Sequence, residues 1–366
     1  MRYMKSILMS GYYGFDNSGD DAILKAIVKD LREIDKDLDI TVLSNNPKKT
    51  EDMYPVKAVN RFNFRDVVFS IKKCSLFISG GGSLLQDVTS TRSLLYYLTV
   101  MSLAKIMNKK VMVYANGIGP INKKTNRMIT KKVLNKVDLI TLRDVMSREY
   151  LDEIGVSNKN ISITADPVYT LEPASKTIIE NILLDEGIPK RETLIGISIR
   201  EWEKAGYLEV SIAEVVDYLI KRYNANVLLI PMHYPEDLNI GKRVLDLVNE
   251  EGCYLLKQKY SVEEIMGIIK ELDMIIAMRL HSLIYAVTQS VPMVGLVYDP
   301  KVEGLLNSLG MNYMCNVEDL CVEDLISNID YVWENKDTIK NDLEKQSKSF
   351  RQLALKNVSL AYDILR

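Results

Sequence analysis

The sequence lacks several features that mark common classes of protein. No window approaches eighteen apolar residues, and the apolar run in the opening MRYMKSILMSGYYG is too short for a signal peptide. The four cysteines form no CxxC pair, which argues against a zinc site or a disulfide framework and fits a reducing compartment: they are Cys74, Cys253, Cys315 and Cys321. We therefore expect a cytoplasmic protein.

Histidine is also scarce, since the chain has only His233 and His281. Two histidines without a cysteine pair nearby leave few ligands for zinc, and the acidic run at residues 19–21 suits a helix cap as well as magnesium. Cationic side chains can neutralise an anionic substrate without help. We predict no bound metal, no cofactor and no nucleic acid partner.

Length and charge indicate two parts. A chain of 366 residues exceeds what one core usually supports, and 47% hydrophobic with 26% charged residues is ordinary for a globular protein. Residues 1–172 carry 26 Lys and Arg against 19 Asp and Glu, and the remainder 21 against 30, so the two halves have net charges of +7 and −9. We place the interdomain connection near residues 171–177, where prolines break the pattern.

The basic excess is concentrated in INKKTNRMITKKVLNK, residues 121–136. The simpler interpretation is a solvated helix face, because most charge runs are. The alternative is attraction to an anionic membrane or to a diphosphate lipid, which would place the protein at the inner face of the cell membrane.

Residues 273–301 organise the chain. Two short apolar runs, 274–278 and 291–298, are typical of buried parallel strands, and the segment between them has the apolar spacing of a helix. Such a βαβ unit binds ligands beyond the carboxyl ends of its strands, where Arg279, His281 and Lys301 fall. A helix start, a guanidinium and an ammonium together favour a carboxylate or phosphate, with Arg279 making a two-pronged contact. Taken singly, each could be an ordinary surface residue.

Glycines and polar groups follow other predicted strands. After the strand at residues 5–10, Gly11 and Gly14 permit a tight loop, which could also be a merely tight turn. Asp16 or Asp20 could act as a base toward a sugar hydroxyl. Further strand ends carry polar or glycine residues that suit a polyhydroxyl or anionic ligand: Asn17, Gly81, Gly82, Asp87, Asn116, Arg143, Asp166, Arg200 and His233. For Arg143 the alternative is an ion pair with the adjacent Asp144.

Polar residues at so many strand ends predict an α/β fold with two Rossmann-like domains facing a cleft. The first domain would cover residues 1–172 and the second 173–366. An apolar stripe in the tail predicts a closing helix, formed by Phe350, Ala354, Val358, Ala361 and Leu365.

The motifs AMRLHSLIYAV and VPMVGLVYDPKVEGLL resemble the signature of the polysaccharide pyruvyl transferases of the CsaB type. The resemblance extends to GYYGFDNSGDDAIL, FISGGGSLLQD, YANGIGP, ITLRD and LLIPMHYPEDL, and so covers nearly the whole chain. It implies transfer of pyruvate from phosphoenolpyruvate onto a cell-wall saccharide as a ketal. Together with the doubled α/β pattern, it also implies that the two Rossmann-like domains have the arrangement called GT-B. The acceptor would be lipid-diphosphate-linked, for example a disaccharide containing N-acetylmannosamine.

The resemblance also assigns roles, with the acceptor in the first domain and the donor in the second. Arg279, Leu280 and His281 would be the donor-binding triplet, aided by Arg143 and Lys301. Arg200 is a further donor-binding candidate because of its place at a strand end. His281, Arg279, Asp16 and Asp20 are the catalytic candidates, and the acceptor candidates are Gly14, Asn17, Gly81, Gly82, Asp87 and Asn116.

Two other functions stay open on the sequence. A GT-B glycosyltransferase or epimerase would use a nucleotide sugar, but the second half shows no clear acidic pair for a ribose. A non-catalytic sugar-binding scaffold would have no use for cations gathered at strand ends.

Overall fold

The computed structural model describes residues 5–88, 90–189 and 193–365. The chain forms two compact units. Unit 1 comprises Met1–Asp16, Asp20–Leu171 and Phe350–Arg366, and unit 2 comprises Asn17–Gly19 and Glu172–Ser349. Sequence analysis did not anticipate that a three-residue segment near the start belongs to unit 2, or that the end of the chain belongs to unit 1.

Unit 1 is built on an eight-stranded sheet in the order β3-β2-β1-β4-β6-β7-β8, with β5 pairing to β6. Every strand pair described in it is parallel. Its elements are β1 (Ser6–Ser10), α1 (Ser18–Ile34, which starts in unit 2), β2 (Asp39–Ser44), α2 (Pro47–Met53), β3 (Lys57–Asn60), α3 (Phe64–Lys73), β4 (Leu76–Ser79), β5 (Gly82–Leu85), α4 (Thr91–Ile106), β6 (Lys110–Ile118), α5 (Lys124–Leu134), β7 (Leu139–Leu142), α6 (Val145–Glu153), β8 (Ile161–Ile163) and the 3-10 turn η1 (Pro167–Thr170).

Unit 2 has a six-stranded parallel sheet in the order β11-β10-β9-β12-β13-β14. The order reverses between β9 and β12, as in Rossmann folds, and ligands bind beyond the carboxyl ends of strands at such a point. Its elements are α7 (Lys176–Asp185), β9 (Leu194–Ser198), α8 (Leu208–Tyr223), β10 (Asn226–Leu229), α9 (Glu236–Leu247), β11 (Cys253–Leu255), α10 (Val262–Lys270), β12 (Met274–Ala277), α11 (Leu280–Gln289), β13 (Met293–Val297), α12 (Pro300–Ser308), β14 (Met314–Asn316), α13 (Val322–Glu334) and α14 (Lys336–Leu365).

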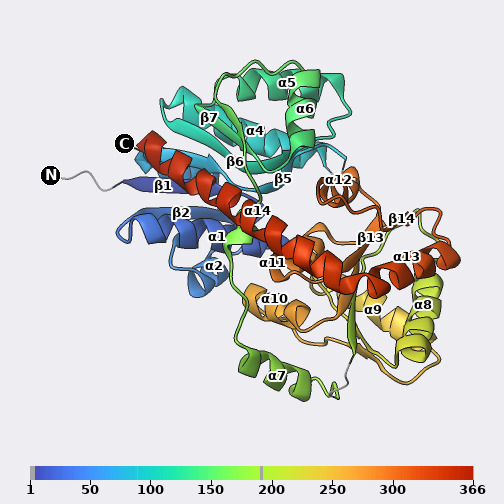
Figure 1. The fold of residues 1–366 in the computed structure, drawn as a ribbon. Coiled ribbons are helices and arrows are strands. Elements are labelled where there is room, and N and C mark those ends of the chain that lie inside the picture. Colours follow the sequence, from blue (N-terminus) through green and yellow to red (C-terminus); the bar gives the residue numbers. More distant parts are fainter. Residues whose placement is uncertain (1–4, 89, 190–192, 366) are drawn as a thin grey trace. The chain divides into compact units, whose positions relative to one another are not determined.

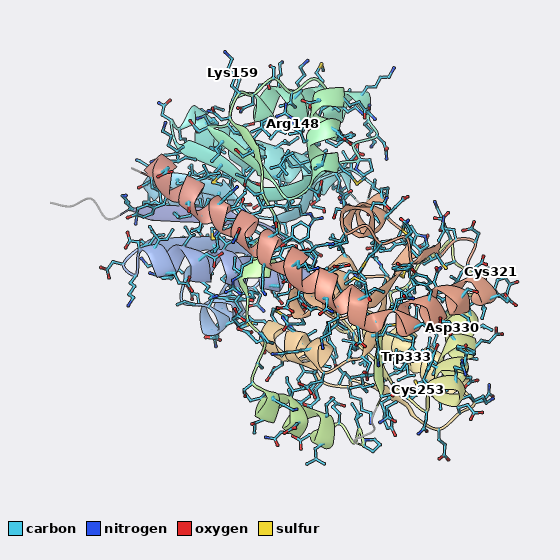
Figure 2. The ribbon with its side chains drawn as sticks, viewed as in Figure 1. Arg148, Lys159, Cys253, Cys321, Asp330 and Trp333 are labelled. Carbon is cyan, nitrogen blue, oxygen red and sulfur yellow. The ribbon has the colours of Figure 1, made fainter. Side chains whose placement is uncertain are left out.

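Contacts between helices sort those of unit 2 into two layers. One layer contains α8, which contacts α9 and α13, and the other contains α10, which contacts α7 and α11. In the first layer Asp330 of α13 accepts a hydrogen bond from Tyr218 Oη at 2.8 Å, and Trp333 packs on the Tyr223 ring with centroids 4.5 Å apart (Figure 2). Strands buried between the two layers account for the uninterrupted apolar runs in the sequence.

The C-terminal helix α14 is one unbroken helix, drawn in red in Figure 1. The middle of its predicted apolar stripe is buried, with Ala354, Val358 and Ala361 at most 4% exposed, whereas Phe350 and Leu365 are partly exposed. Within unit 1 the Phe350 ring stacks on Tyr169 at 4.9 Å, and Asn357 Nδ2 donates to the Ala165 carbonyl at 3.0 Å. The last part of α14 therefore completes unit 1, which corrects its expected assignment to the second domain.

None of the helices in the described part of the chain is both long and apolar enough to cross a bilayer.

Candidate functional site

The carboxyl edge of the unit 2 sheet gathers the predicted cationic residues. β9 and β12 are paired in register, with Ser198 opposite Ala277. Arg200 follows β9, Arg279 follows β12 and Lys301 follows β13, so all three lie at this edge, around the point where the strand order reverses. We take this edge as the candidate site.

Arg279 is the N-cap residue of α11 and is held by a buried carboxylate. Its Nε donates to Asp237 Oδ2 at 3.0 Å and its Nη2 donates to Asp237 Oδ1. The Asp237 side chain is 1% exposed and also accepts hydrogen bonds from the backbone amides of Met232 and His233. The expected two-pronged grip on a ligand is thus made on Asp237 instead, and among the described residues Nη1 has no acceptor.

His281 lies in the first turn of α11, against the segment Asn17–Gly19. A Cβ atom added to Gly19 would stand 2.1 Å from His281 Nδ1, so only glycine allows this close approach. Asn17 forms a bridge with His233, and the Ser18 amide donates to the Met232 carbonyl at 3.0 Å. The segment therefore fixes one side of the imidazole.

This role of Gly19 was missed in the sequence. The only signal was a glycine beside two aspartates, which equally suits a helix start. Asn17 was a candidate for binding the acceptor sugar, but its Oδ1 accepts a hydrogen bond from the Gly19 amide at 3.0 Å. Ser18 Oγ lies 3.1 Å from Tyr285 Oη. Both residues thus shape the surroundings of α11.

Arg200 and Lys301 complete the edge. The Arg200 guanidinium lies 5.2 Å from the centre of the Tyr298 ring and 5.9 Å from that of Trp202. Lys301 Nζ lies 3.7 Å from Asp299 Oδ2, and its side chain is 20% exposed. These cations keep a positive charge beside the starts of α11 and α12, where unpaired backbone amides also favour an anion.

The candidate glycines of unit 1 allow close packing of neighbouring groups and do not leave the backbone open to a ligand. Gly82 begins β5 and pairs with Asn116, so it belongs to a strand and not only to the end of one, where we expected it. Gly81 is buried against Ile23, and Gly14, at φ +80°, lies so close to the Ser44 side chain that no Cβ fits. β6 likewise continues through Asn116 to Ile118, so Asn116 lies within the strand and not at its end as we predicted.

Three polar candidates in unit 1 are occupied by structural contacts. Asp87 accepts hydrogen bonds from the Asn122 and Lys123 amides and from Asn126, and these lower its pKa although burial acts in the opposite direction. Asn116, fully buried, donates to the Gly80 carbonyl at 2.7 Å.

Arg143 is the third occupied candidate, with a side chain that is 5% exposed. It pairs with Asp166 at 3.1 Å, contacts Asp144 at 3.5 Å and donates to Ser83 Oγ at 2.9 Å. The ion pair with Asp144, which was the alternative to a ligand-binding role, is therefore present, but Asp166 is the closer partner. These contacts tie strand ends together and leave Arg143 little surface for a donor.

The two candidate bases differ in their surroundings. Asp16, at φ 61°, forms an ion pair with Lys49 at 2.5 Å. Asp20, in the first turn of α1, has Oδ1 3.2 Å from the position of a Cβ on Gly82. Burial, together with the nearby Asp20 carboxylate, raises the pKa of Tyr13. Asp20 thus lies among the strand ends of unit 1, whereas Asp16 is held by Lys49.

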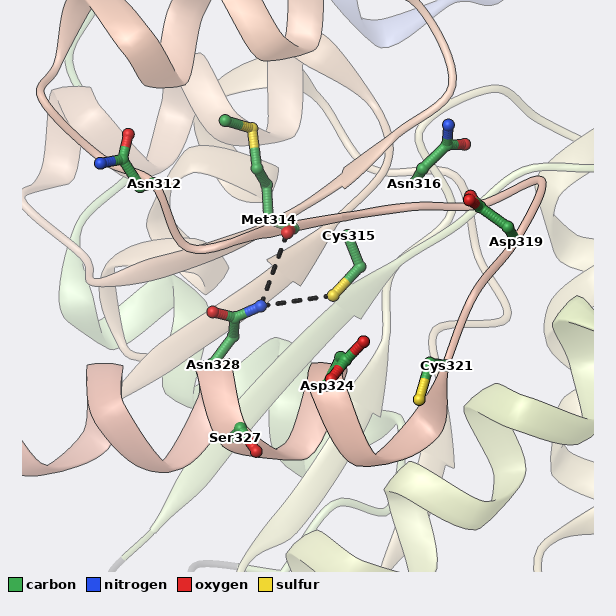
Figure 3. Close-up of a pocket in the computed structure, with 9 residues that line it drawn as sticks. All are labelled: Asn312, Met314, Cys315, Asn316, Asp319, Cys321, Asp324, Ser327 and Asn328. Atoms are coloured by element: carbon green, nitrogen blue, oxygen red, sulfur yellow. Dashed lines mark hydrogen bonds between the residues drawn. The ribbon is translucent and has the colours of Figure 1, made fainter.

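A separate hollow of about 450 Å³ lies along β14 and α13 (Figure 3). Its lining contains amides, carboxylates and two thiols, with no Lys, Arg or His: Asn312, Met314, Cys315, Asn316, Asp319, Cys321, Asp324, Ser327 and Asn328. Lacking cations, it does not suit an anionic donor, and we do not include it in the candidate site.

Comparisons with known proteins agree with this picture. A family model described as polysaccharide pyruvyl transferase matches residues 17–300. The amylovoran biosynthesis protein AmsJ of Erwinia amylovora is 22% identical over an alignment of 426 positions, which covers 98% of this chain and 99% of that protein.

Solved structures show the fold. The UDP-GlcNAc 2-epimerase of Methanocaldococcus jannaschii matches with a TM-score of 0.69 at 14% identity, covering 98% of this chain and 99% of that one. A glycosyltransferase of Rickettsia africae matches with a TM-score of 0.66 at 14% identity, covering 99% of each chain. The predicted GT-B-like fold of two Rossmann-like domains is confirmed.

Proposed function

Because the chain belongs to the polysaccharide pyruvyl transferase family, we propose that it moves pyruvate from phosphoenolpyruvate onto a saccharide and forms a ketal. The observation that carries this proposal is the pair Arg279 and His281 at the start of α11, where the strand order of the unit 2 sheet reverses. An anion binds well at such a helix start, and an imidazole beside it can transfer a proton.

Unit 2 supplies the groups for the donor. Phosphoenolpyruvate carries a carboxylate and a phosphate on adjacent atoms, so its site needs more than one cation. We assign Arg279 Nη1, Lys301 and Arg200 to these two groups, together with the amides of the first turn that includes Leu280. Asp237 keeps the Arg279 fork in place and so acts as a positioning residue.

The reaction then needs one proton at carbon and two attacks by oxygen. We assign His281 the transfer of a proton to the methylene carbon, which makes the adjacent carbon electrophilic. One acceptor hydroxyl bonds to that carbon, the bond to phosphate oxygen breaks, and a second hydroxyl closes the ketal. Of the two hydroxyl protons released, one replaces the proton given to carbon and the other leaves with phosphate.

Unit 1 would hold the acceptor, with Asp20 as the base for a hydroxyl. We prefer Asp20 to Asp16 because the latter is neutralised by Lys49. We expect the acceptor to be a lipid-diphosphate-linked saccharide, such as a disaccharide with N-acetylmannosamine.

We also propose peripheral association with anionic membranes through α5. Lys123, Lys124, Lys131, Lys132 and Lys136 are all exposed, which leaves their charges available to anionic lipids.

The test is incubation with phosphoenolpyruvate and a panel of lipid-linked disaccharides, followed by mass spectrometry. The expected product gains the mass of one pyruvate less one water and appears with an equal amount of phosphate. Absence of any product, combined with a rise in melting temperature on adding a uridine nucleotide but not phosphoenolpyruvate, would favour the nucleotide-sugar alternative.

A further inference from the structure

Arg61 of unit 1 is a buried cation at the carboxyl edge of the sheet. It directly follows β3, its amide donates to the Ser44 carbonyl at 2.9 Å, and the residue is 5% exposed. Its Nη1 donates to the carbonyl of Gly11, the residue after β1, at 2.9 Å. The guanidinium therefore reaches from β3 to the end of β1, beside the point where the strand order of this sheet reverses.

Aromatic rings surround this guanidinium. Its carbon lies 4.4 Å from the centre of the Tyr96 ring, 5.3 Å from Tyr97, and 5.5 Å from both Phe15 and Phe62. We call these five residues the arginine cage. In the described part of the chain no acidic group forms an ion pair with Arg61, and its Nε is buried without a hydrogen-bond acceptor.

A buried charge without a counter-charge is unfavourable, and an arginine cannot escape by losing its proton. The negative faces of the rings offset part of this cost. A group that is kept charged and under-bonded at a ligand-binding edge has capacity for an anion, because charge-assisted hydrogen bonds to phosphate are strong.

The cage also offers surface to a sugar. Phe62 is 68% exposed, whereas Phe15 and Tyr96 are half-buried and Tyr97 is buried. The Phe15 ring is itself stacked on Tyr12, with centroids 4.0 Å apart and planes 8° from parallel. Phe62 is therefore the ring that a ligand would cover on reaching Arg61.

We propose that the arginine cage binds the sugar phosphate part of the acceptor, with the phosphate as the missing counter-charge of Arg61 and the sugar against Phe62. Only the identification of this sugar phosphate as part of the acceptor rests on the proposed function. The binding of a sugar phosphate to unit 1 can be measured without any transfer reaction.

The experiment is calorimetric titration of the full chain with N-acetylglucosamine 1-phosphate, using Arg61→Met, which fills the cage without charge. Arg65→Met is the matched control, because Arg65 is exposed and lies four residues along the same segment. We expect the dissociation constant to rise roughly tenfold or more in Arg61→Met and to stay within about twofold in Arg65→Met. Unchanged binding in a folded Arg61→Met protein would overturn the proposal.

Further arms identify the ligand and guard against misfolding. Phe62→Ala, at an exposed ring, should weaken binding of the sugar phosphate and leave binding of inorganic pyrophosphate unchanged. Equal binding of pyrophosphate and the sugar phosphate, insensitive to Phe62→Ala, would overturn the sugar part. Phosphoenolpyruvate titrated into Arg61→Met should bind as to the wild type. If it binds neither protein, the proposed function fails while the cage is still tested by the sugar phosphate.

Discussion

The two units treat buried charges in opposite ways. In unit 2, the buried Asp237 forms a two-pronged pair with Arg279, whose side chain is 13% exposed. In unit 1, Arg61 is buried among rings, and Asp30, which is 1% exposed, has a hydroxyl partner in Thr170 and no ion-pair partner among the described residues.

Pairing fixes geometry, whereas an unpaired charge must find another way to lower its energy. A carboxylate can take up a proton, and burial raises the pKa of Asp30 from its ordinary 3.8 to about 7. Arginine has no such option, so it keeps an attraction for anions. The comparison indicates that unit 2 fixes Arg279 at the start of α11 by pairing it with Asp237. In unit 1, Arg61 keeps a positive charge that can pair with an anionic ligand.

The largest expected effect concerns His281, which lies two residues after Arg279 at the start of α11. His281→Ala should lower turnover by about 10²- to 10⁴-fold, the usual contribution of a positioned acid or base, with a smaller change in donor affinity. Release of phosphate from phosphoenolpyruvate in the presence of acceptor measures this. Near-normal turnover in a folded His281→Ala protein would remove the histidine from the mechanism.

Breaking the pair itself should cost stability. Asp237→Asn leaves the partly buried Arg279 charge without its partner, and we expect the free energy of unfolding to fall by roughly 3 kcal/mol. Urea unfolding measures the change. The double variant Asp237→Asn with Arg279→Met should recover part of the loss, because no isolated charge is left. A loss below about 1 kcal/mol in the single variant would mean that the ion pair in unit 2 does not stabilise the fold more than the unpaired charges in unit 1 do.

Gly19→Ala tests how closely the imidazole is held. The new methyl group would overlap His281 Nδ1, so the ring must rotate out of place, and a displacement of this size can lower turnover by roughly 10²-fold. Stability should change little because a side chain, not backbone, has to move. Gly206→Ala is the matched control, since its added Cβ meets nothing within 4 Å. Equal activity of the two variants would show that the contact is unimportant.

The pH dependence of stability tests the unpaired carboxyl in unit 1. Because the pKa of Asp30 is higher in the folded than in the unfolded chain, the folded state binds its proton more tightly. Its stabilising contribution is therefore present at low pH and is lost as the pH rises through about 7. Comparing wild type with Asp30→Asn, we expect the difference in the free energy of unfolding to change by roughly 2 to 3 kcal/mol between pH 5 and pH 8. A difference that does not vary with pH would show that Asp30 is ionised throughout.

The smallest effect concerns charges that remain in water. Changing Lys123, Lys124, Lys131 and Lys132 to Gln should weaken co-sedimentation with anionic liposomes, by about 1 kcal/mol for each lysine that lies near the surface. Wild-type binding should itself fall with added salt, because the attraction is screened within roughly 8 Å at physiological ionic strength. Binding that ignores both salt and substitution would return these lysines to a solvated helix face.

The sequence predicted the strands and helices well where the apolar pattern was strong. The expected runs at 274–278 and 291–298 contain β12 and β13, and Arg279 and Lys301 follow them as predicted. Period and composition suffice for this, because a buried parallel strand is apolar throughout.

The partners of those side chains could not be predicted. Asp237 lies 42 residues from Arg279, Asp166 lies 23 from Arg143, and Gly19 and His281 meet from distant parts of the chain. The residue that follows a strand is a local property of the sequence. The carboxylate or ring that reaches it from another loop depends on how those loops pack, and the rings around Arg61 come from three separate segments.

The path of α14 has a consequence for synthesis of the chain. Unit 1 begins with β1, yet Phe350 and Asn357, which contact Tyr169 and Ala165, follow every residue of unit 2 in the chain. Every residue of unit 2 has left the ribosome before the core of unit 1 can close. The nascent first half must therefore wait with part of its apolar surface uncovered, and the unit that starts first is finished last.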